Sequence, residues 1–464
     1  MGTKKLSVMD AMFLAAENRE SMMHVGGMLT FTLPADAPPN FLRQVADELR
    51  GDVPVYSPWN LRLRTPDFLS NPLQAWVEDE VDLEYHVRRS ALPSPGDERE
   101  LGILVSRLHS IPIDFHRPPW EVHFIEGLSG GRFALYFKLH HALVDGYTGM
   151  KLLARSLSDD PAERDTPLFF SQPPLSREPR PESADEPLPP TLSSLFELAR
   201  VQYGAAREAG RAFWNVLRAA SVGDRDLISP LQAPRSILNR KISRNRRFAT
   251  AQFATERVRR VARASGGTIN DVALALVGAA LRRQLGELGE LPDAPLTAMI
   301  PVNIRPKDDP GGGNAVAAVL ASLATDVAEP EMRLGAIIAS TRRAKEQLQG
   351  MSKSAMIQYS AMLMAPLSLQ QVPGAAGRVR PAFNVVVSNV PGPDKPLYFR
   401  GARLDAPFPV SIPFHGAGLN ITINGYCDTL NVGFTGCRDT IPRLQRIAVY
   451  ASDALEELEA VYPG

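Results

Sequence analysis

The sequence contains no run of about 18 apolar residues, the length at which a helix becomes able to cross a membrane. Its opening stretch, MGTKKLSVMDAMFL, has two lysines but no long apolar segment and no small-residue cleavage site. We therefore expect neither a membrane-spanning helix nor a signal peptide. Any membrane contact is predicted to be peripheral.

Cysteine is also scarce, and neither sign of charge is in excess. The two cysteines, Cys427 and Cys437, cannot form a disulfide framework and are typical of reduced thiols in a cytosolic protein. Lysine plus arginine equals aspartate plus glutamate at 51 residues each, which argues against a nucleic-acid-binding protein. We expect a cytoplasmic protein with no nucleic-acid partner.

The length of 464 residues exceeds what one hydrophobic core usually serves, which predicts two domains. Residues 158–190 contain nine prolines among acidic residues and serines, a composition typical of an exposed linker. We therefore place an N-terminal domain at residues 1–157 and a leading helix with a C-terminal domain at residues 191–464. Strands alternate with helices in both parts, which predicts an α/β fold.

Hydrophobic periodicity predicts the individual elements. Alternation indicates strands at residues 24–33 and 84–89 and a hairpin at 419–435, and helical spacing indicates helices at 97–110 and 332–349.

Two basic segments follow the predicted linker. Residues 191–220 form a helical pattern whose apolar side lies beside arginines, which suits either a surface helix on anionic lipid or a helix that bridges the domains. The densest basic run follows, and we expect it to be solvated or lipid-facing rather than bound to a phosphate. Its residues are Arg240, Lys241, Arg244, Arg246 and Arg247.

The stretch at residues 132–153, RFALYFKLHHALVDGYTGMKLL, changes its period part-way. Apolar residues alternate up to Leu139, as in a strand with one apolar face, whereas residues 147–153 follow helical spacing. Such junctions are where folds place chemistry. This one carries a polar cluster of His140, His141, Asp145 and Gly146.

The polar cluster has four interpretations, of which one, accidental occurrence, is less expected for the full pattern than for any single residue. In a catalytic one, His141 is a general base, because histidine titrates near neutral pH; Asp145 holds a neighbouring group, and Gly146 lets the backbone turn without a Cβ atom. In a metal-binding one, His140, His141 and Asp145 are ligands, but adjacent strand residues point to opposite faces and do not easily share one ion. In a structural one, two hydrogen-bonded histidines end a strand.

Several motifs carry a resemblance to a known family. HHALVDG at residues 140–146 matches the HHxxxDG signature of the CoA-dependent acyltransferase superfamily, which includes peptide-synthetase condensation domains. Further matches are LSVMDAMFL at 6–14, PPW at 118–120, ND at 270–271 and SNVPGP at 388–393. Together they make the chain resemble the bacterial wax ester synthase/diacylglycerol acyltransferase family from end to end. Pro119 departs from the pattern, since the family usually has leucine there, which concerns local packing rather than chemistry.

The resemblance implies a fold and a set of site residues. The fold would consist of two chloramphenicol-acetyltransferase-like domains with mixed sheets and a substrate tunnel between them. The implied catalytic residues are His141 as general base, His140, Asp145, Gly146 and Asn270. The residues implied to line the substrate site are Pro118, Pro119, Trp120, Asp271, Ser388 and Asn389.

The implied activity is transfer of a fatty acyl group from acyl-CoA to a long-chain alcohol, giving a wax ester, or to diacylglycerol, giving triacylglycerol. His141 would deprotonate the acceptor hydroxyl, which attacks the thioester without an acyl-enzyme, and Asn270 would donate to the developing oxyanion. The implied requirements are acyl-CoA as a substrate, no other cofactor and no metal. The implied location is the cytoplasmic side of the inner membrane or the surface of lipid inclusions.

Three alternatives stay open. One is an acyltransferase of the same superfamily with another alcohol acceptor, and another is an inactive lipid-binding or droplet protein, because a fold does not imply a function. The third is a hydrolase that uses Ser129, whose surroundings GLSGG match the G-x-S-x-G nucleophile elbow. A second strand follows this stretch at once, which favours a hairpin turn instead.

Overall fold

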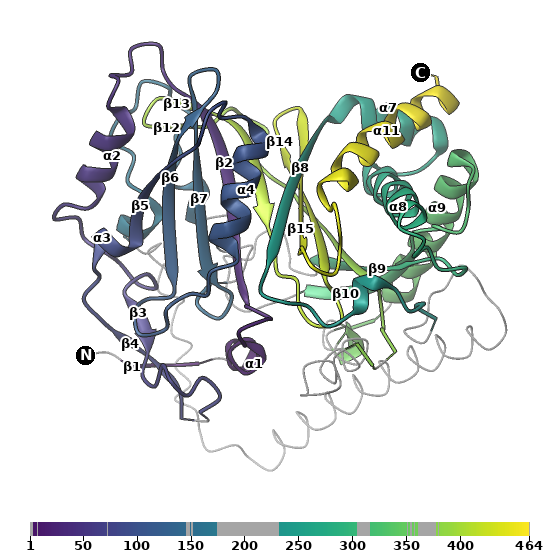
Figure 1. Ribbon diagram of the computed structural model, residues 1–464, viewed down its shortest axis with the longest axis horizontal. Helices are drawn as coiled ribbons and strands as arrows, with labels where there is room; N and C mark the ends of the chain where they lie inside the picture. Colours follow the sequence, from purple (N-terminus) through teal and green to yellow (C-terminus); the bar gives the residue numbers. More distant parts are fainter. Residues whose placement is uncertain are drawn as a thin grey trace.

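The computed structural model describes residues 3–6, 8–71, 73–144, 149, 152–173, 232–303, 316–349, 351–352, 355–356, 358–360, 377–378 and 380–463. Two six-stranded sheets stand side by side, with helices on the outer side of each (Figure 1). Both sheets are mixed, because each contains parallel as well as antiparallel pairs. The predicted α/β fold with mixed sheets is therefore confirmed.

The first sheet has the order β12-β13-β2-β7-β6-β5. Its strands are β2 (His24–Thr32), β5 (Val87–Ala91), β6 (Trp120–Leu128), β7 (Arg132–His140), β12 (Tyr398–Phe399) and β13 (Ala402–Val410). Helices α2 (Phe41–Leu49), α3 (Leu83–His86) and α4 (Glu98–His109) accompany it. A small sheet lies below, made of β1 (Thr3–Lys5), β4 (Ala75–Glu78) and β3 (Leu61–Leu63).

The second sheet has the order β10-β9-β11-β14-β15-β8. Its strands are β8 (Arg246–Ala254), β9 (Thr297–Asn303), β10 (Val316–Ser322), β11 (Val385–Val390), β14 (Leu419–Tyr426) and β15 (Thr429–Cys437). Its outer face is covered by α7 (Thr255–Ser265), α8 (Ile269–Glu287), α9 (Pro330–Leu348) and α11 (Gln445–Val461) (Figure 1). Within the described residues no single helix has the length and hydropathy to cross a membrane, although α7 and α8 reach both together as a pair bent by 99°.

Strand β7 is buried on both faces, whereas its alternation predicts only one apolar face. Phe133 and Phe137 enter the core of the first half, and Ala134 and Tyr136 face α4. The second face is buried because α4 and Phe248 of β8 cover it. A central strand that carries layers on both sides loses the contrast between a core face and a solvent face.

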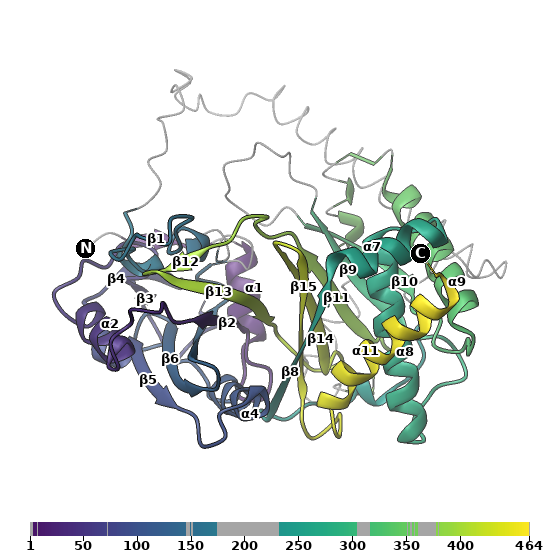
Figure 2. The ribbon, with the colours of Figure 1, turned by 90° about the horizontal axis from the view of Figure 1, so that it is seen from above.

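The predicted domain boundaries are wrong at two places. Residues 168–170, inside the predicted linker, pack into the core of the first half, where Phe170 stacks on Trp120. Strands β12 and β13 come from the C-terminal part of the chain but complete the N-terminal sheet beside β2, as the view from above shows (Figure 2). A segment from the C-terminal part of the chain therefore completes the N-terminal sheet, and no single position in the sequence divides the two halves.

The two halves are also joined where α4 of the first half contacts β8, the edge strand of the second sheet. The hydroxyl of Ser106 accepts the N–H of Phe248 at 2.9 Å, and that of Ser110 accepts the N–H of Arg246 at 2.8 Å. These serines satisfy edge amides that have no strand partner, which stops the sheet from pairing further.

Most predicted elements are confirmed, including β2, α4, α9 and the β14–β15 hairpin. The stretch at residues 84–89 is an exception, because it opens as helix α3 and becomes strand only at Val87. The cause is a local cap: the Asp82 carboxylate accepts the N–H of Tyr85 at 3.1 Å and starts a helical turn.

Because β12 and β13 belong to the N-terminal sheet, a residue late in the sequence is predicted to stabilise the N-terminal half. Phe399 is fully buried between Phe31 and Phe124. We expect Phe399→Ala to lower the free energy of unfolding by about 3–5 kcal/mol, the usual cost of emptying a buried phenylalanine site. Urea unfolding followed by the fluorescence of Trp59 and Trp120 would measure it. Val449→Ala, at a position that is 57% exposed, is the control and should change stability by less than about 0.5 kcal/mol.

Candidate active site

The histidine pair lies at the end of β7 and is held there by its backbone. The N–H of His140 donates to the carbonyl of Pro119 at 2.9 Å, and the N–H of His141 donates to the carbonyl of Met23 at 2.9 Å. His140 also lies opposite His24 in the antiparallel register of β2 and β7. Two segments from different parts of the chain therefore fix where the pair emerges from the sheet.

The ring of His140 is enclosed by protein. The side chain is 1% exposed, its Nδ1 atom accepts the N–H of Ala142 at 3.2 Å, and the edge of Phe115 lies against it. Because Nδ1 accepts, the proton of the neutral ring is on Nε2. That atom faces the Glu17 carboxylate at 3.5 Å. These contacts hold the ring in place and leave it little access to a substrate.

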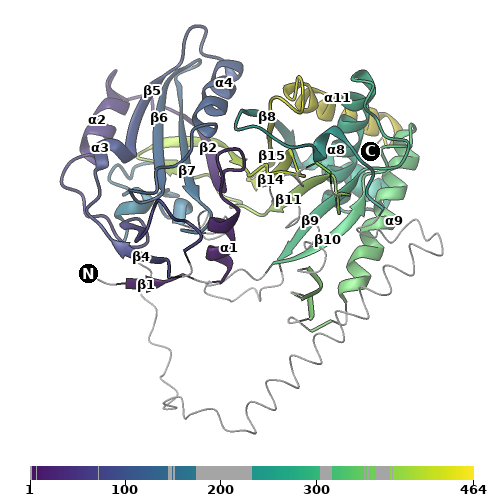
Figure 3. The ribbon, with the colours of Figure 1, turned by 60° about the horizontal axis from the view of Figure 1, so that its bottom comes forward.

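The ring of His141 has different surroundings. It is half-buried and stacks on Phe13 of helix α1 (Val8–Ala16), with ring centroids 4.0 Å apart. Figure 3 shows α1 at the junction of the two halves of the molecule. The two rings therefore lie in separate environments, His140 on the last residue of β7 and His141 on the first residue of the turn that follows. Within the described residues, no group of three or more histidine, cysteine, aspartate or glutamate side chains is arranged to hold a metal.

Glu17 is a site residue that the sequence analysis missed. Its side chain is 7% exposed, and the carboxylate both faces His140 and accepts the N–H of Met23. A carboxylate that faces a ring nitrogen of a histidine orients the ring. The sequence signal was weak, since Glu17 lies three residues beyond the N-terminal motif and its neighbour Asn18 is equally polar.

Residues 118–120 support the histidine strand. Pro119 supplies the carbonyl that holds the His140 N–H, and the Trp120 indole N–H donates to the carbonyl of Trp59 at 2.7 Å. The Trp120 side chain is 1% exposed and belongs to the core of the first half. Protein surrounds the indole, and the implied contact of Trp120 with substrate stays a prediction. Pro118 is also buried and accepts the Trp120 N–H through its carbonyl at 2.8 Å.

Asn270 and Asp271 open helix α8, where they differ in role. Thr268 and Asp271 form a capping box, and the other Asp271 oxygen accepts the hydroxyl of Thr341 on α9 at 2.7 Å. The Asp271 carboxylate therefore binds protein donors, and its implied place in the substrate site stays a prediction. Asn270 is half-buried, and its side chain makes no hydrogen bond to a described residue. Its role as an oxyanion donor stays a prediction.

Ser388 and Asn389 lie in β11, which pairs in parallel with β14. The strand pairs with β9 only at Val385 and Val386, so Ser388 and Asn389 lie beyond that contact; Ser388 is half-buried and Asn389 is exposed. Substrate contact by either side chain stays a prediction. Asp145 and Gly146 lie outside the described residues, as do residues 191–220.

The basic run at residues 240–247 is not a uniform solvated face. Arg240 pairs with Glu290 at 3.0 Å and Lys241 pairs with Glu20 at 2.8 Å. Arg246 is 3% exposed and donates to main-chain carbonyls. The prediction of a solvated run holds for Arg240, Lys241 and Arg244, which are exposed, and fails for Arg246, whose side chain turns inward where β8 begins.

Family models account for most of the chain. Residues 6–273 match the wax ester synthase/diacylglycerol acyltransferase catalytic domain, and residues 312–459 match the C-terminal domain of the same family. The chain belongs to the wax ester synthase/diacylglycerol acyltransferase family. It is therefore an acyltransferase, and the resemblance inferred from its motifs is confirmed.

Individual relatives agree with this assignment. A Mycobacterium tuberculosis protein named as a diacylglycerol O-acyltransferase is 50% identical, over 98% of this chain and 97% of the relative. The solved structure of the wax ester synthase/diacylglycerol acyltransferase from Marinobacter aquaeolei VT8 is 37% identical, with a TM-score of 0.76, over 99% of this chain and 100% of that one. A condensation domain of the calcium-dependent antibiotic synthetase, 17% identical with a TM-score of 0.57 and covering 98% and 95% of the two chains, shares the fold.

Asn270 and Asp271, neighbours at the start of α8, are expected to contribute differently to the stability of this acyltransferase. Asp271→Ala removes the capping box and the bond to Thr341, and should lower the free energy of unfolding by about 1–3 kcal/mol. Asn270→Ala removes no described hydrogen bond and should leave stability within about 0.5 kcal/mol. Denaturant unfolding of both variants checks this, and equal losses of stability would contradict it.

Burial of His86 predicts that the stability of the protein falls as the pH is lowered. His86 stacks on Trp120 and binds its carbonyl through Nδ1 at 2.7 Å, and burial lowers the pKa of His86 to about 4. Between about pH 6.5 and pH 4 the unfolded chain takes up a proton that native His86 does not. The stability due to neutral His86 is therefore complete above about pH 6.5 and falls toward pH 4 by about 1.4 kcal/mol per pH unit.

We expect urea unfolding at pH 7, 6 and 5 to show this loss in the wild type and a shallower slope in His86→Phe. The comparison is needed because burial also lowers the pKa values of His24, His109 and His123. Parallel slopes for the two proteins would show that His86 does not contribute.

Proposed function

We propose that this acyltransferase moves a fatty acyl group from acyl-CoA to the hydroxyl of diacylglycerol or of a long-chain alcohol, with His141 as the general base. The carrying observation is the contrast within the histidine pair. His140 is 1% exposed and hydrogen-bonded through its ring, whereas His141, the next residue, is half-buried and stacks on Phe13. We infer that the less buried ring, that of His141, is the one that a substrate reaches.

The reaction needs no protein nucleophile. His141 takes the proton of the acceptor hydroxyl as the oxygen attacks the thioester carbonyl carbon. The C–S bond then breaks, and the imidazolium returns the proton to the CoA thiolate. General-base assistance contributes about 10² to 10⁴ in rate, and holding both substrates beside the ring contributes at least comparably. The reaction requires acyl-CoA as a substrate and no additional cofactor.

The supporting residues act on the ring and on the charge that develops. Phe13 limits the rotation of His141, and the Met23 carbonyl holds its backbone. Asn270, at the second position of α8 with a side chain free of described hydrogen bonds, is the proposed donor to the tetrahedral oxyanion. Because the Asn270 side chain makes no described hydrogen bond within the protein, its N–H group can donate to the oxyanion in the transition state.

Diacylglycerol is the proposed preferred acceptor. Relatives at 50%, 42% and 40% identity are named as diacylglycerol O-acyltransferases, whereas the family and its solved member carry both activities in their names. Both acceptors are water-insoluble, so we further propose that the protein works at a membrane or lipid-inclusion surface on the cytoplasmic side. A tunnel between the two halves is the proposed route by which acyl chains reach His141.

The hydrolase alternative has no support from geometry. Ser129 lies in the exposed turn of the β6–β7 hairpin, as predicted from its context. The histidines lie at the opposite end of β7, about 30 Å away for a strand of this length. A serine nucleophile needs a base within hydrogen-bond reach.

The proposal predicts that His141→Ala lowers acceptor-dependent release of CoA from palmitoyl-CoA by about 10²- to 10⁴-fold. Thiol release would be measured with dioleoylglycerol or hexadecanol as acceptor, and the lipid products would be separated. Ser129→Ala is the matched control and should keep full activity.

Each outcome decides one point. Full turnover in His141→Ala would refute the general-base assignment, and Ser129-dependent turnover would favour a hydrolase. A wild-type protein that binds lipid without turnover would favour the binding-protein alternative. Greater product formation with hexadecanol would reverse the proposed acceptor preference.

A further inference from the structure

Both histidines of the candidate site depend on one short segment, residues 17–23, which joins α1 to β2 and is called the junction loop below. Its last residue, Met23, accepts the His141 N–H at 2.9 Å. Its first residue, Glu17, faces Nε2 of His140 at 3.5 Å. A shift of the junction loop would therefore move the supports of both rings together.

Local contacts shape the junction loop without anchoring it. The Asn18 side chain accepts the N–H groups of Glu20 and Ser21 at 3.0 and 2.8 Å and donates to the carbonyl of Ala16 at 3.2 Å. All partners lie within three residues of Asn18. These bonds define a turn, but its position relative to β7 and the second half needs contacts from outside.

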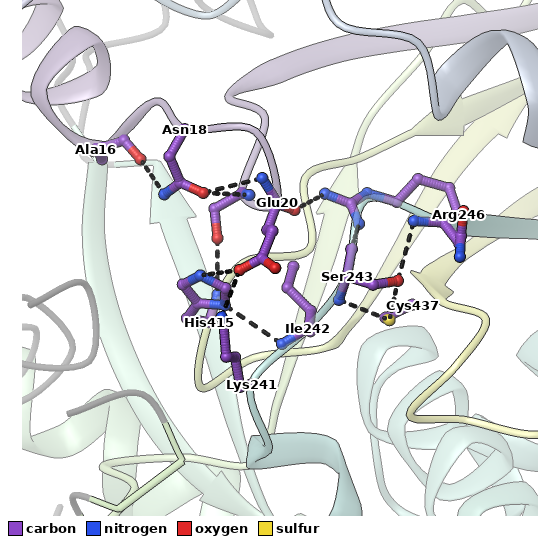
Figure 4. Close-up of polar contacts among 11 residues, drawn as sticks. Ala16, Asn18, Glu20, Lys241, Ile242, Ser243, Arg246, His415 and Cys437 are labelled. Atoms are coloured by element: carbon purple, nitrogen blue, oxygen red, sulfur yellow. Dashed lines mark hydrogen bonds and ion pairs between the residues drawn. The ribbon is translucent and has the colours of Figure 1, made fainter. Parts of the chain in front are cut away.

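The second half of the molecule supplies those contacts (Figure 4). Arg246 donates to the carbonyl of Glu20 at 2.6 Å, and Lys241 pairs with the Glu20 carboxylate at 2.8 Å. The N–H of His415 donates to the hydroxyl of Ser21 at 3.1 Å, and Nδ1 of His415 accepts the N–H of Ile242 at 3.3 Å. The junction loop is thus held by a partner surface that belongs entirely to the C-terminal half.

Arg246 is the most enclosed of these contacts. It is 3% exposed, its guanidinium donates to the carbonyls of Ser243 and Glu20, and its backbone N–H donates to the hydroxyl of Ser110, the residue after α4. No carboxylate of a described residue lies within 4.0 Å of the guanidinium. Burying a cation without a paired anion is costly, and burial lowers the pKa of Arg246 to about 10.

The cost is explained if Arg246 performs a task that an apolar residue cannot. Its rigid, planar donors bridge two carbonyls, one on each half of the molecule. The Lys241 side chain is 60% exposed, so it can change its conformation without disturbing neighbouring residues. Arg246 has no such freedom, so it sets the distance between the junction loop and β8.

We propose that Arg246 is a positioning residue for acyl transfer, which fixes the junction loop from the C-terminal half and thereby places Glu17, His140 and His141. This inference rests on the proposed function of His141. It adds that the geometry of the histidine pair is set jointly by the two halves rather than by β7 alone.

The test compares Arg246→Met with Arg333→Met. Arg333 is a matched control, because it is 4% exposed, lies on α9 and also donates to two main-chain carbonyls, those of Val327 and Ala328. Both variants lose a buried cation, but only Arg246 contacts the junction loop. With protein concentration corrected for the folded fraction, we expect kcat of Arg246→Met to fall by about 10- to 100-fold, as for a reacting group misplaced by about 1 Å.

Further readouts separate positioning from a general loss of stability. We expect KM for palmitoyl-CoA to be unchanged in Arg246→Met, because the contact is lost from the reacting geometry and not from CoA binding. Arg246→Lys, which keeps a charged donor, should recover part of kcat. Ser21→Ala, a one-atom change on the loop side of the joint, should lower kcat in the same way if Arg246→Met does not fold.

Amide hydrogen exchange tests the proposal without any assay of turnover. The N–H groups of Met23 and His141 should exchange faster in Arg246→Met, and Ser21→Ala should show the same direction, whereas Arg333→Met should leave both unchanged. A wild type without activity would refute the proposed function and leave this exchange test valid. Equal kcat losses in Arg246→Met and Arg333→Met, or unchanged exchange at both amides, would overturn the role of Arg246.

Discussion

The pairing of β13 with β2 is the constraint on which the candidate site depends. Strand β2 lies between β13 and β7, so its register is set on both sides. That register places His24 opposite His140, and it places Met23, one residue before β2, where its carbonyl meets the His141 N–H. A slip of one residue would turn every side chain of β2 to the other face, and the histidine pair would lose its backbone support.

The two adjacent histidines at the end of β7 have rings that lie in different surroundings. Successive residues point to opposite faces, so one ring enters a closed pocket of Glu17, Phe115 and the Ala142 amide, and the next ring reaches the junction of the halves. The backbone of each histidine is held in the same way, by a carbonyl of another segment, so the two residues differ in the surroundings of their rings and not in how they are anchored.

The halves are joined by polar contacts as well as by apolar packing. Phe248 of β8 packs against α4, while Ser106 and Ser110 hold the β8 amides and Arg246 holds the junction loop. Hydrogen bonds have directions that apolar contacts lack, so they fix the relative position of two surfaces more narrowly. Such a joint suits a site whose supports come from both halves.

By itself the sequence determined the α/β class, most of the helices and strands, and the family through its HHxxxDG motif, because periodicity and contiguous motifs are local properties. Only the tertiary structure decided that Glu17 faces His140, that Trp120 is core, that Arg246 is buried and that β13 completes the N-terminal sheet. Each of these depends on residues far apart in the chain, and local pattern carries no information about which distant segment supplies the partner of a given side chain.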